Sequence, residues 1–318
     1  MIIDIYSHHI SNSVGKILLK SKHSGAGKVI QNPPQNADPE VRLGLMDKYG
    51  IDIQALSQTA PVLMGFNAED AAEICMLSNN DNYALCKSHP NRFVNICIIS
   101  LLDMKSAIRE LSRSINELDC RGVTIATNQN GKGLDSPEYF PFYEKLTEHD
   151  LPLLLHPTHW ESYPLVDMEN GWWMMHILGW PFDTTQAVWR LIFGGVLDRY
   201  PSLKVVTHHL GALLPYFSGR IEGVFNGTLR DKLPKHITGY WKNIYGDTAL
   251  GGTKSAYLCG YEFFGPDRML YGTDYPFGPE AGEGFIRESV SSIKNMNIQD
   301  EEKKKILGEN ARKILKIK

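Results

Sequence analysis

Short runs of apolar and β-branched residues alternate along the chain with longer segments in which apolar residues recur at helical spacing. This alternation is typical of repeated strand–helix units that build a parallel sheet. Eight strands are predicted, at Ile2–Tyr6, Ile53–Ser57, Phe93–Ile98, Gly122–Ala126, Pro152–Leu155, Lys204–Thr207, Asn243–Gly246 and Arg268–Tyr271. Eight such units predict an α/β fold of the (β/α)₈, or TIM-barrel, type.

Local signals mark where several of the intervening helices begin. Asp38-Pro39-Glu40 sets an N-cap residue before a proline at the first helical position, and Asn67 with Asp70 resembles a capping box. We expect helices at Val41–Lys48, Ala71–Ser88, Met104–Leu118, Ser136–His149, Thr184–Tyr200, Ala212–Phe225, Lys254–Cys259, Ala281–Met296 and Asp300–Leu315.

A doubly wound open sheet would show the same alternation, so the number of strands alone does not settle closure. No Gly-x-Gly-x-x-Gly follows the first strand, which weakens that competitor. The 318 residues suit one barrel domain that spans residues 1–318. Segment Ser11–Asn36 is rich in glycine and proline, and we expect an inserted excursion there that covers the active site.

Charge and cysteine content narrow the class of ligand and the compartment. The formal net charge is −3 and the isoelectric point is near 6.4, so nothing general favours nucleic acid or an anionic membrane, and a small-molecule ligand fits better. The five cysteines form no Cys-x-x-Cys pair and are expected to be reduced core residues. No basic leader and no membrane-length apolar stretch are present, so we expect a cytoplasmic protein.

Polar side chains follow four of the predicted strands. His8 follows the first strand, His156 the fifth, the pair His208-His209 the sixth and Asp274 the eighth. Barrel enzymes keep their catalytic groups at strand ends, and imidazole with carboxylate is a ligand set for zinc, iron, manganese or cobalt. One such histidine alone is more often structural, but the joint pattern predicts a catalytic site for one divalent metal.

The segments that carry these residues resemble the amidohydrolase superfamily, in particular the decarboxylase family typified by aminocarboxymuconate-semialdehyde decarboxylase and relatives that act on hydroxybenzoates. The resemblance extends over nearly the full chain and rests on Met1–His8, Asp38–Arg42, Leu155–Pro157, Gly194–Val196 with Lys204–His209, and Tyr271–Phe277. It implies a metal-dependent, non-oxidative decarboxylase of a small conjugated or aromatic carboxylic acid. Zinc is the expected metal, with manganese, iron and cobalt as alternatives.

The resemblance also implies roles for individual residues. His8, His156 and Asp274 are similar to metal ligands of the family, and Asp274 would share acid–base duty. His209 resembles the family's catalytic histidine, which works as a general base. Its neighbour His208 stays open as the alternative for that role.

Tyr6 departs from the family pattern, because it stands where the first metal histidine would be, or a glutamate in the hydroxybenzoate branch. A bound cation lowers the pKa of a phenol, so Tyr6 is a candidate ligand, but it can equally pack or donate a hydrogen bond. His159 and His176 follow the fifth strand and are placed to compensate or to contact substrate, although neither matches a ligand of the family.

Two further residues are expected to bind the substrate. Trp173 matches a tryptophan that lines the family's pocket, and Arg220 resembles an arginine that is lent to a neighbouring subunit's site to hold a carboxylate. A homodimer is therefore expected. The alternatives are ordinary packing for the tryptophan and a surface ion pair for the arginine.

Two other functions stay open at this point. A metal-dependent hydrolase or hydratase would use the same scaffold and the same residues. A metal-free binding barrel would follow if the change at Tyr6 had abolished the metal site, because a fold does not guarantee a function.

Overall fold

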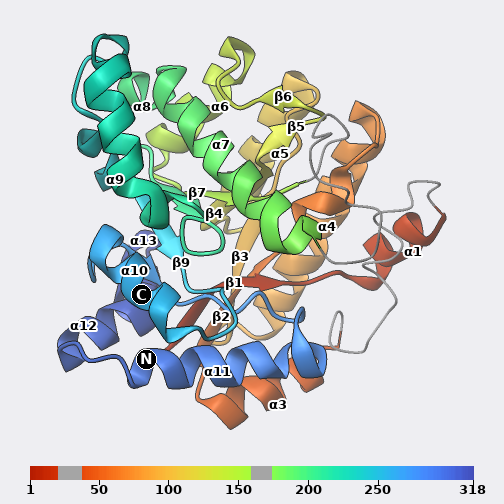
Figure 1. Ribbon diagram of the computed structural model, residues 1–318. Coiled ribbons are helices and arrows are strands. Elements are labelled where there is room, and N and C mark those ends of the chain that lie inside the picture. The colour runs from red at the N-terminus through yellow and green to blue at the C-terminus, as the bar shows by residue number, and fades with distance from the viewer. Residues whose placement is uncertain (21–37, 159–173) are drawn as a thin grey trace.

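The computed structural model describes residues 1–20, 38–158 and 174–318 of the chain. Eight parallel strands follow one another in chain order, with helices packed around them (Figure 1). The strands are β1 (Ile3–His8), β2 (Ile53–Ser57), β3 (Phe93–Ile98), β4 (Gly122–Ala126), β7 (Leu153–His156), β8 (Val205–Thr207), β9 (Ile244–Asp247) and β10 (Met269–Leu270). Each of the eight predicted strands is confirmed, and so is the TIM barrel.

Backbone hydrogen bonds between the first and last strands close the barrel. The amide of Ile5 donates to the carbonyl of Tyr271 at 2.9 Å, and the amide of Asp274 donates to the carbonyl of Tyr6 at 2.9 Å. Strand β1 is therefore bonded to β2 on one side and to the end of β10 on the other. This closure excludes the open sheet and sets Tyr6 beside Asp274.

The helices are α1 (Asn12–Lys20), α3 (Pro39–Tyr49), α4 (Ala68–Ser88), α5 (Met104–Glu117), α6 (Phe140–Glu148), α7 (Trp180–Phe193), α8 (Val196–Arg199), α9 (Leu214–Val224), α10 (Lys254–Phe264), α11 (Glu283–Lys294), α12 (Asp300–Lys304) and α13 (Asn310–Ile314). The predicted caps are present: Asp38 accepts from the amide of Glu40, and Asn67 accepts from the amide of Asp70. No helix of the described residues is long and apolar enough to cross a membrane.

Two predicted helices are interrupted. The segment expected as Thr184–Tyr200 begins earlier, at Trp180, and splits into α7 and α8 because Gly195 adopts φ 75°. The segment expected as Asp300–Leu315 contains a π-helical turn at Lys305–Glu309 between α12 and α13. Neither break has a proline, and helical periodicity continues across both, so the pattern alone predicts one helix in each case.

The excursion predicted after β1 begins with a helix rather than a loop. Helix α1 buries Val14 and Leu18 against Ile74 and Cys75 of α4. Apolar residues three and four apart mark this helix in the sequence, but the glycines and prolines that follow outweighed that signal. The remainder of the predicted excursion lies outside the described residues.

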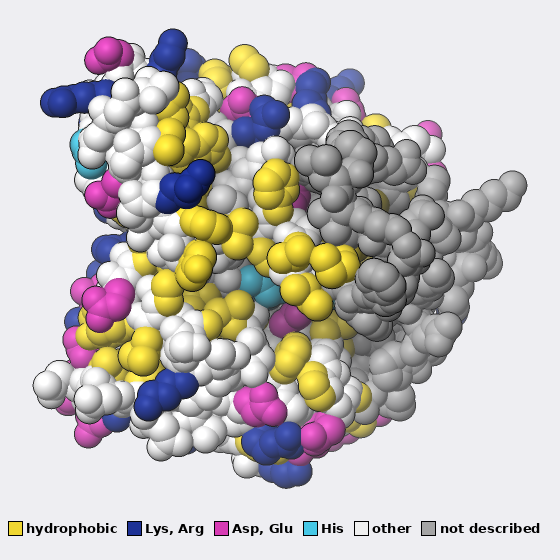
Figure 2. Space-filling view, in the orientation of Figure 1, with side chains coloured by type: hydrophobic (Ala, Val, Ile, Leu, Met, Phe, Trp, Pro, Cys, Tyr) yellow, Lys and Arg dark blue, Asp and Glu magenta, His cyan; other side chains and the backbone are white. Residues whose placement is uncertain are grey.

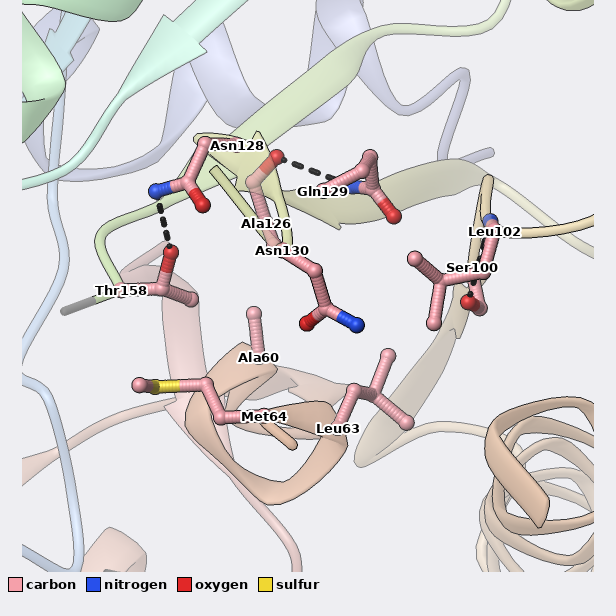
Figure 3. A pocket seen from close by; sticks show the side chains of 10 residues that line it. All are labelled: Ala60, Leu63, Met64, Ser100, Leu102, Ala126, Asn128, Gln129, Asn130 and Thr158. Carbon is pink, nitrogen blue, oxygen red and sulfur yellow. Dashed lines mark hydrogen bonds between the residues drawn. The ribbon is translucent and has the colours of Figure 1, made fainter. Parts of the chain in front are cut away.

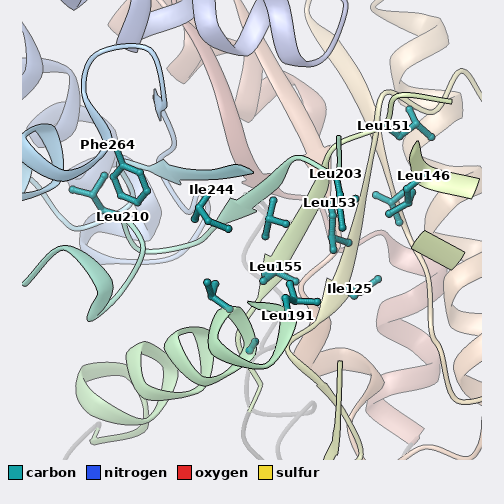
Figure 4. Packing of buried hydrophobic residues seen from close by; sticks show 14 of the residues in the cluster. Ile125, Leu146, Leu151, Leu153, Leu155, Leu191, Leu203, Leu210, Ile244 and Phe264 are labelled. Carbon is teal, nitrogen blue, oxygen red and sulfur yellow. The ribbon is translucent and has the colours of Figure 1, made fainter. Parts of the chain in front are cut away.

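Side chains of each strand alternate between the barrel interior and the helical layer. In β7, Leu153 and Leu155 belong to the outer cluster that includes Leu191 of α7 (Figure 4). Leu154 belongs to the inner cluster with Val206 of β8. Buried apolar area of this kind is the main stabilising term of the fold. The interior cluster also includes residues of α13.

A β-bulge in β1 changes which of its side chains face inward. Asp4 pairs with Gln54 and Ser7 pairs with Leu56, so three steps along β1 match two steps along β2. The extra residue re-aims the strand. Tyr6 consequently joins the interior cluster just before the strand ends at His8.

Candidate active site

Histidine and carboxylate side chains meet where the strands end. His8 ends β1, His156 ends β7, His208 follows β8 and Asp274 follows β10. Asp274 Oδ1 lies 3.1 Å from His8 Nε2 and 3.4 Å from His208 Nε2. The ligand atoms of the three histidines all lie within 4.8 Å of one another, and the three rings are buried.

The protein backbone and a serine fix two of these rings. His156 Nδ1 is 2.8 Å from the carbonyl of Pro157, so Nδ1 carries the proton and Nε2 keeps its lone pair. His8 Nδ1 is 3.2 Å from Ser57 Oγ. The Nε2 atom of His8 is buried and faces Asp274 Oδ1 at 3.1 Å. Both rings therefore direct an available nitrogen at the centre.

A carboxylate fixes the third ring. His208 Nδ1 lies 2.5 Å from Asp247 Oδ2, and Asp247 is itself held because its Oδ1 accepts from the amide of Ala249. Burial disfavours a charged His208, but its ion pairs with Asp247 and Asp274 outweigh burial and raise its pKa to about 10. The remaining nitrogen, Nε2, faces Asp274.

Tyr6 lies beneath His208 with its oxygen directed elsewhere. The two rings stack with centroids 4.0 Å apart and an interplanar angle of 12°. The Tyr6 hydroxyl donates a 2.9 Å hydrogen bond to the carbonyl of Leu155. Complete burial, together with the nearby charge of Asp247, raises the pKa of Tyr6 well above its ordinary value. Tyr6 is thus a neutral phenol.

Asp274 occupies an unusual backbone conformation, with φ 62°. A non-glycine residue in the left-handed region is uncommon, and asparagine and aspartate tolerate it best. Burial opposes its charge, but hydrogen bonds with His208 and His8 outweigh burial and hold the pKa of Asp274 well below its usual range. A carboxylate at this position therefore carries a negative charge into the cluster.

His209 sits above this cluster and is partly exposed. Its backbone is also left-handed, at φ 54°, and its ring centroid lies 3.8 Å from that of His208. Trp180 is nearly parallel to it at 6.1 Å. Burial and the positive charge of His208 lower the pKa of His209 to about 3, and its Nδ1 has no hydrogen-bond partner in the described part of the chain. His209 is therefore a neutral imidazole whose Nδ1 is not engaged by the described residues.

A buried arginine supports the strand end that carries His8. Arg42 donates to the carbonyl of His8 at 2.5 Å, to Ser7 Oγ at 3.2 Å and to Gln54 Oε1 at 3.1 Å. Its guanidinium lies 4.6 Å from the ring centroid of Tyr275. Arg42, at the end of the Asp38–Arg42 segment noted in the sequence, therefore holds the backbone of β1 in place where it carries His8.

Asp4 ties together the strands on both sides of the site. Its carboxylate accepts hydrogen bonds from the Thr273 hydroxyl at 2.6 Å, from the Thr273 amide at 3.1 Å and from Gln54 Nε2 at 3.0 Å. Because Thr273 immediately precedes Asp274, these bonds connect the turn that carries Asp274 to β1 and β2.

The other predicted site residues lie at the rim or outside the described range. His176 belongs to a π-helical turn, Met175–Gly179, and is exposed with its ring 4.1 Å from that of Trp180. Arg220 is exposed on α9. His159 and Trp173 lie outside the described residues.

Two contributors were not assigned from the sequence. Asp247 ends β9, so the signal that found the other residues, a polar residue at a strand end, also applies to it. His208 was named only as the alternative to His209 for the role of base. Sequence order could not separate them, because they differ in burial and in partner: His208 is buried and paired with Asp247, whereas His209 is partly exposed.

The face around the site is largely apolar. Figure 2 shows hydrophobic side chains around a hollow in which a histidine and an acidic side chain are visible. Next to the end of β7, a cavity of about 10 Å³ is lined by Asn128, Gln129, Asn130 and Thr158 with apolar neighbours (Figure 3). Asn128 Nδ2 donates to Thr158 Oγ1 at 2.9 Å. The cavity has room for roughly one water molecule.

The residues present fit a divalent metal. Three buried imidazoles and a charged carboxylate converge, His8 Nε2 faces Asp274 Oδ1 at 3.1 Å, and the opposite ring nitrogens are held by oxygen atoms of the protein. Metal-binding histidines commonly donate their other N–H to a carboxylate or a carbonyl in this way.

Comparison with known proteins gives consistent results. A family model described as amidohydrolase matches residues 6–317. The 2-amino-3-carboxymuconate-6-semialdehyde decarboxylase of Dictyostelium discoideum is 32% identical over 306 residues, which cover 93% of this chain and 82% of that protein. The gamma-resorcylate decarboxylase of a Rhizobium species is 28% identical, covering 81% and 84% of the two chains.

A solved structure is also similar over the whole chain. The 5-carboxyvanillate decarboxylase of Novosphingobium aromaticivorans, complexed with manganese and 4-hydroxy-3-methoxy-5-nitrobenzoic acid, has a TM-score of 0.89 and 25% identity. The match covers 100% of this chain and 96% of that one.

Proposed function

The chain belongs to the amidohydrolase family, and on that premise we propose that it is a metal-dependent, non-oxidative decarboxylase of a small conjugated or aromatic carboxylic acid. One observation carries the proposal: the Nε2 side of buried histidines and the charged carboxylate of Asp274 meet at the strand ends of the barrel. The similar proteins named decarboxylases supply the reaction class, a carboxy-lyase.

We propose that His8, His156 and Asp274 hold the metal. When bound, the metal would supply positive charge that stabilises negative charge developing on the substrate oxygens. Zinc is the metal that we propose first, because imidazole nitrogen suits zinc, whereas manganese prefers oxygen ligands. The manganese-bound 5-carboxyvanillate decarboxylase makes manganese the main alternative.

The remaining chemistry is a proton replacing carbon dioxide. The bond to the carboxylate breaks, its electron pair stays on the substrate carbon, and a proton is delivered there. His209 and Asp274 have atoms within 4.8 Å of each other, a gap that one bridging water molecule or a substrate oxygen can span to carry a proton between the partly exposed ring and the carboxylate. The parallel ring of Trp180 shields His209 from water on one side.

The test is an assay of carbon dioxide release from hydroxybenzoates, carboxyvanillate-like acids and muconate-type acids, with the other product identified by mass spectrometry. We expect carbon dioxide and the decarboxylated product in equal amounts. Hydrolysis of esters, lactones or amides without carbon dioxide would instead identify the hydrolase alternative. If the purified protein contained no metal and catalysed neither reaction, the alternative of a non-catalytic binding barrel would remain.

We further propose a homodimer in which Arg220 reaches the neighbouring site to hold a substrate carboxylate. Support comes from α9, where Arg220 is exposed beside Tyr216, which is 76% exposed, and Val224, which is 46% exposed. No described residue forms an ion pair or hydrogen bond with the Arg220 guanidinium. Large apolar side chains exposed around an unpaired arginine are typical of interfaces between proteins.

Arg220→Ala is expected to raise KM by about 10–100-fold, the cost of losing a charge-assisted contact, with little change in thermal stability. Steady-state kinetics and light scattering over a dilution series measure the two parts of the prediction. The matched control is Arg230→Ala, another exposed arginine, which should leave KM unchanged. Activity that does not depend on protein concentration down to a monomeric sample would contradict the shared site.

We propose that the protein works in a reducing compartment such as the cytoplasm, because its cysteines form no disulfide bonds. All five are free, and Cys75, Cys97 and Cys120 are buried. Burial raises the pKa of the Cys75 thiol, which keeps it in the unreactive protonated form.

A further inference from the structure

We propose that His208 is a fourth protein ligand of the metal, and that Asp247 is the positioning residue that aims it. In this assignment His8, His156 and Asp274 complete the set, while Tyr6 binds no metal. The inference rests on the proposed function, since it presupposes a metal centre at these strand ends.

Asp247 sets the orientation of the His208 ring. Asp247 Oδ2 forms a 2.5 Å hydrogen bond with His208 Nδ1, so Nε2 is the nitrogen that faces Asp274. His208 belongs to the same triad of ligand atoms as His8 and His156, and it is as deeply buried as they are. A carboxylate behind a buried imidazole is the usual support of a metal-binding histidine.

The Tyr6 hydroxyl is directed away from the cluster. That hydroxyl is engaged with the carbonyl of Leu155 at 2.9 Å, an interaction that requires the phenol to keep its proton. Ligation would need both the loss of this bond and the release of the proton. The face of the ring, rather than its oxygen, meets the site, because it stacks on His208 at 4.0 Å.

The stacking of Tyr6 on His208 explains how His208 can replace a ligand that would otherwise come from β1. Tyr6 and His208 occupy adjoining space from β1 and from the end of β8, so an imidazole from either strand can enter the same side of the centre. The tyrosine that departs from the family pattern therefore does not imply a missing ligand. Three imidazoles and one carboxylate would also favour zinc over manganese.

The experiment compares metal content and affinity in purified full-length variants, by elemental analysis and by competition with a chromophoric chelator. His208→Ala should lose more affinity than the ~10–100-fold typical of an outer-shell change, and Asp247→Asn should lose about that amount. Tyr6→Phe should keep the wild-type affinity. The matched control is His9→Ala: His9 is buried next to His8, but its Nδ1 is held by Asn82 at 2.7 Å and it belongs to neither ligand cluster.

A second readout counts the ligands directly. In the Co²⁺-loaded protein, coordinated imidazoles whose Nδ1–H is held by the protein give paramagnetically shifted, exchangeable proton signals. We expect three such signals in the wild type, in Tyr6→Phe and in His9→Ala, and two in His208→Ala. The double variant Tyr6→His/His208→Ala should regain metal affinity, because an imidazole from β1 would then take the place of the one lost from the end of β8.

The outcomes separate the two proposals. A wild-type protein that binds no metal would overturn the proposed function and this assignment with it. Metal bound equally well by wild type and folded His208→Ala, or two shifted signals in the wild type, would overturn the assignment alone. A loss of metal in Tyr6→Phe would identify Tyr6 as the ligand instead. Circular dichroism of each variant separates loss of metal from loss of fold.

Discussion

Asp274→Asn is expected to lower kcat for carbon dioxide release by about 10³-fold, within the range that removal of an acid–base group produces. The substitution removes a charge that lies 3.1 Å from His8 Nε2, and with it a group able to hold the transferred proton. It leaves the shape of the side chain unchanged. The expected result is an enzyme that is assembled but inactive.

The backbone makes asparagine the informative choice. Asp274 has φ 62°, a conformation that asparagine adopts more readily than alanine, so Asp274→Ala would add backbone strain to the loss of chemistry. An asparagine oxygen still reaches the metal position as a neutral ligand. Metal content measured alongside kcat should therefore fall far less than activity.

A control from the same molecule is Asp300→Asn, because the Asp300 side chain is 81% exposed and forms a 3.2 Å ion pair with Lys303. Its kcat should match that of the wild type. If Asp274→Asn retained more than about a tenth of the activity, acid–base duty would have to be assigned to His209 alone.

The fold could be predicted from the sequence because local signals agree with one another. Strands β2, β3 and β4 have the predicted bounds, since each is an apolar run flanked by helices with clear caps. Helix breaks were missed where the cause is conformational, as at Gly195 with φ 75°. Glycine permits that conformation but does not require it.

The site could be predicted only in part. His8, His156 and Asp274 follow from the rule that barrel chemistry sits at strand ends. The distinction between His208 and His209 depends on a run of four left-handed residues, His209 to Ala212, that begins directly after His208, so that His208 is buried against Asp247 while His209 stays partly exposed. No spacing rule encodes that turn.

The role of Tyr6 could not be predicted because it depends on a bulge. The residue pattern of β1 reads as plain alternation, yet the extra residue between Asp4 and Ser7 turns Tyr6 into the interior. There its hydroxyl meets the carbonyl of Leu155 from the other side of the barrel. Register within a closed sheet, and not local propensity, decides what such a side chain contacts.

Removal of the metal is expected to abolish activity and to lower the melting temperature. A ligand that binds only the folded state stabilises it by about 2.7 kcal/mol at 100 times Kd and about 4.1 kcal/mol at 1,000 times Kd. For a domain of this size, that corresponds to a fall of roughly 4–6 °C after dialysis against a chelator. Differential scanning calorimetry and the carbon dioxide assay on the same sample measure both effects.

Readdition of single metals tests which ion the site prefers. Three imidazoles and one carboxylate should restore activity and melting temperature at the lowest concentration with Zn²⁺, with Co²⁺ next and Mn²⁺ last. His156→Ala is the control, because its melting temperature should no longer respond to Zn²⁺. Full activity in chelator-treated protein that elemental analysis finds free of metal would contradict the metal centre. The charged cluster of His208, Asp247 and Asp274 would then have to act without an ion.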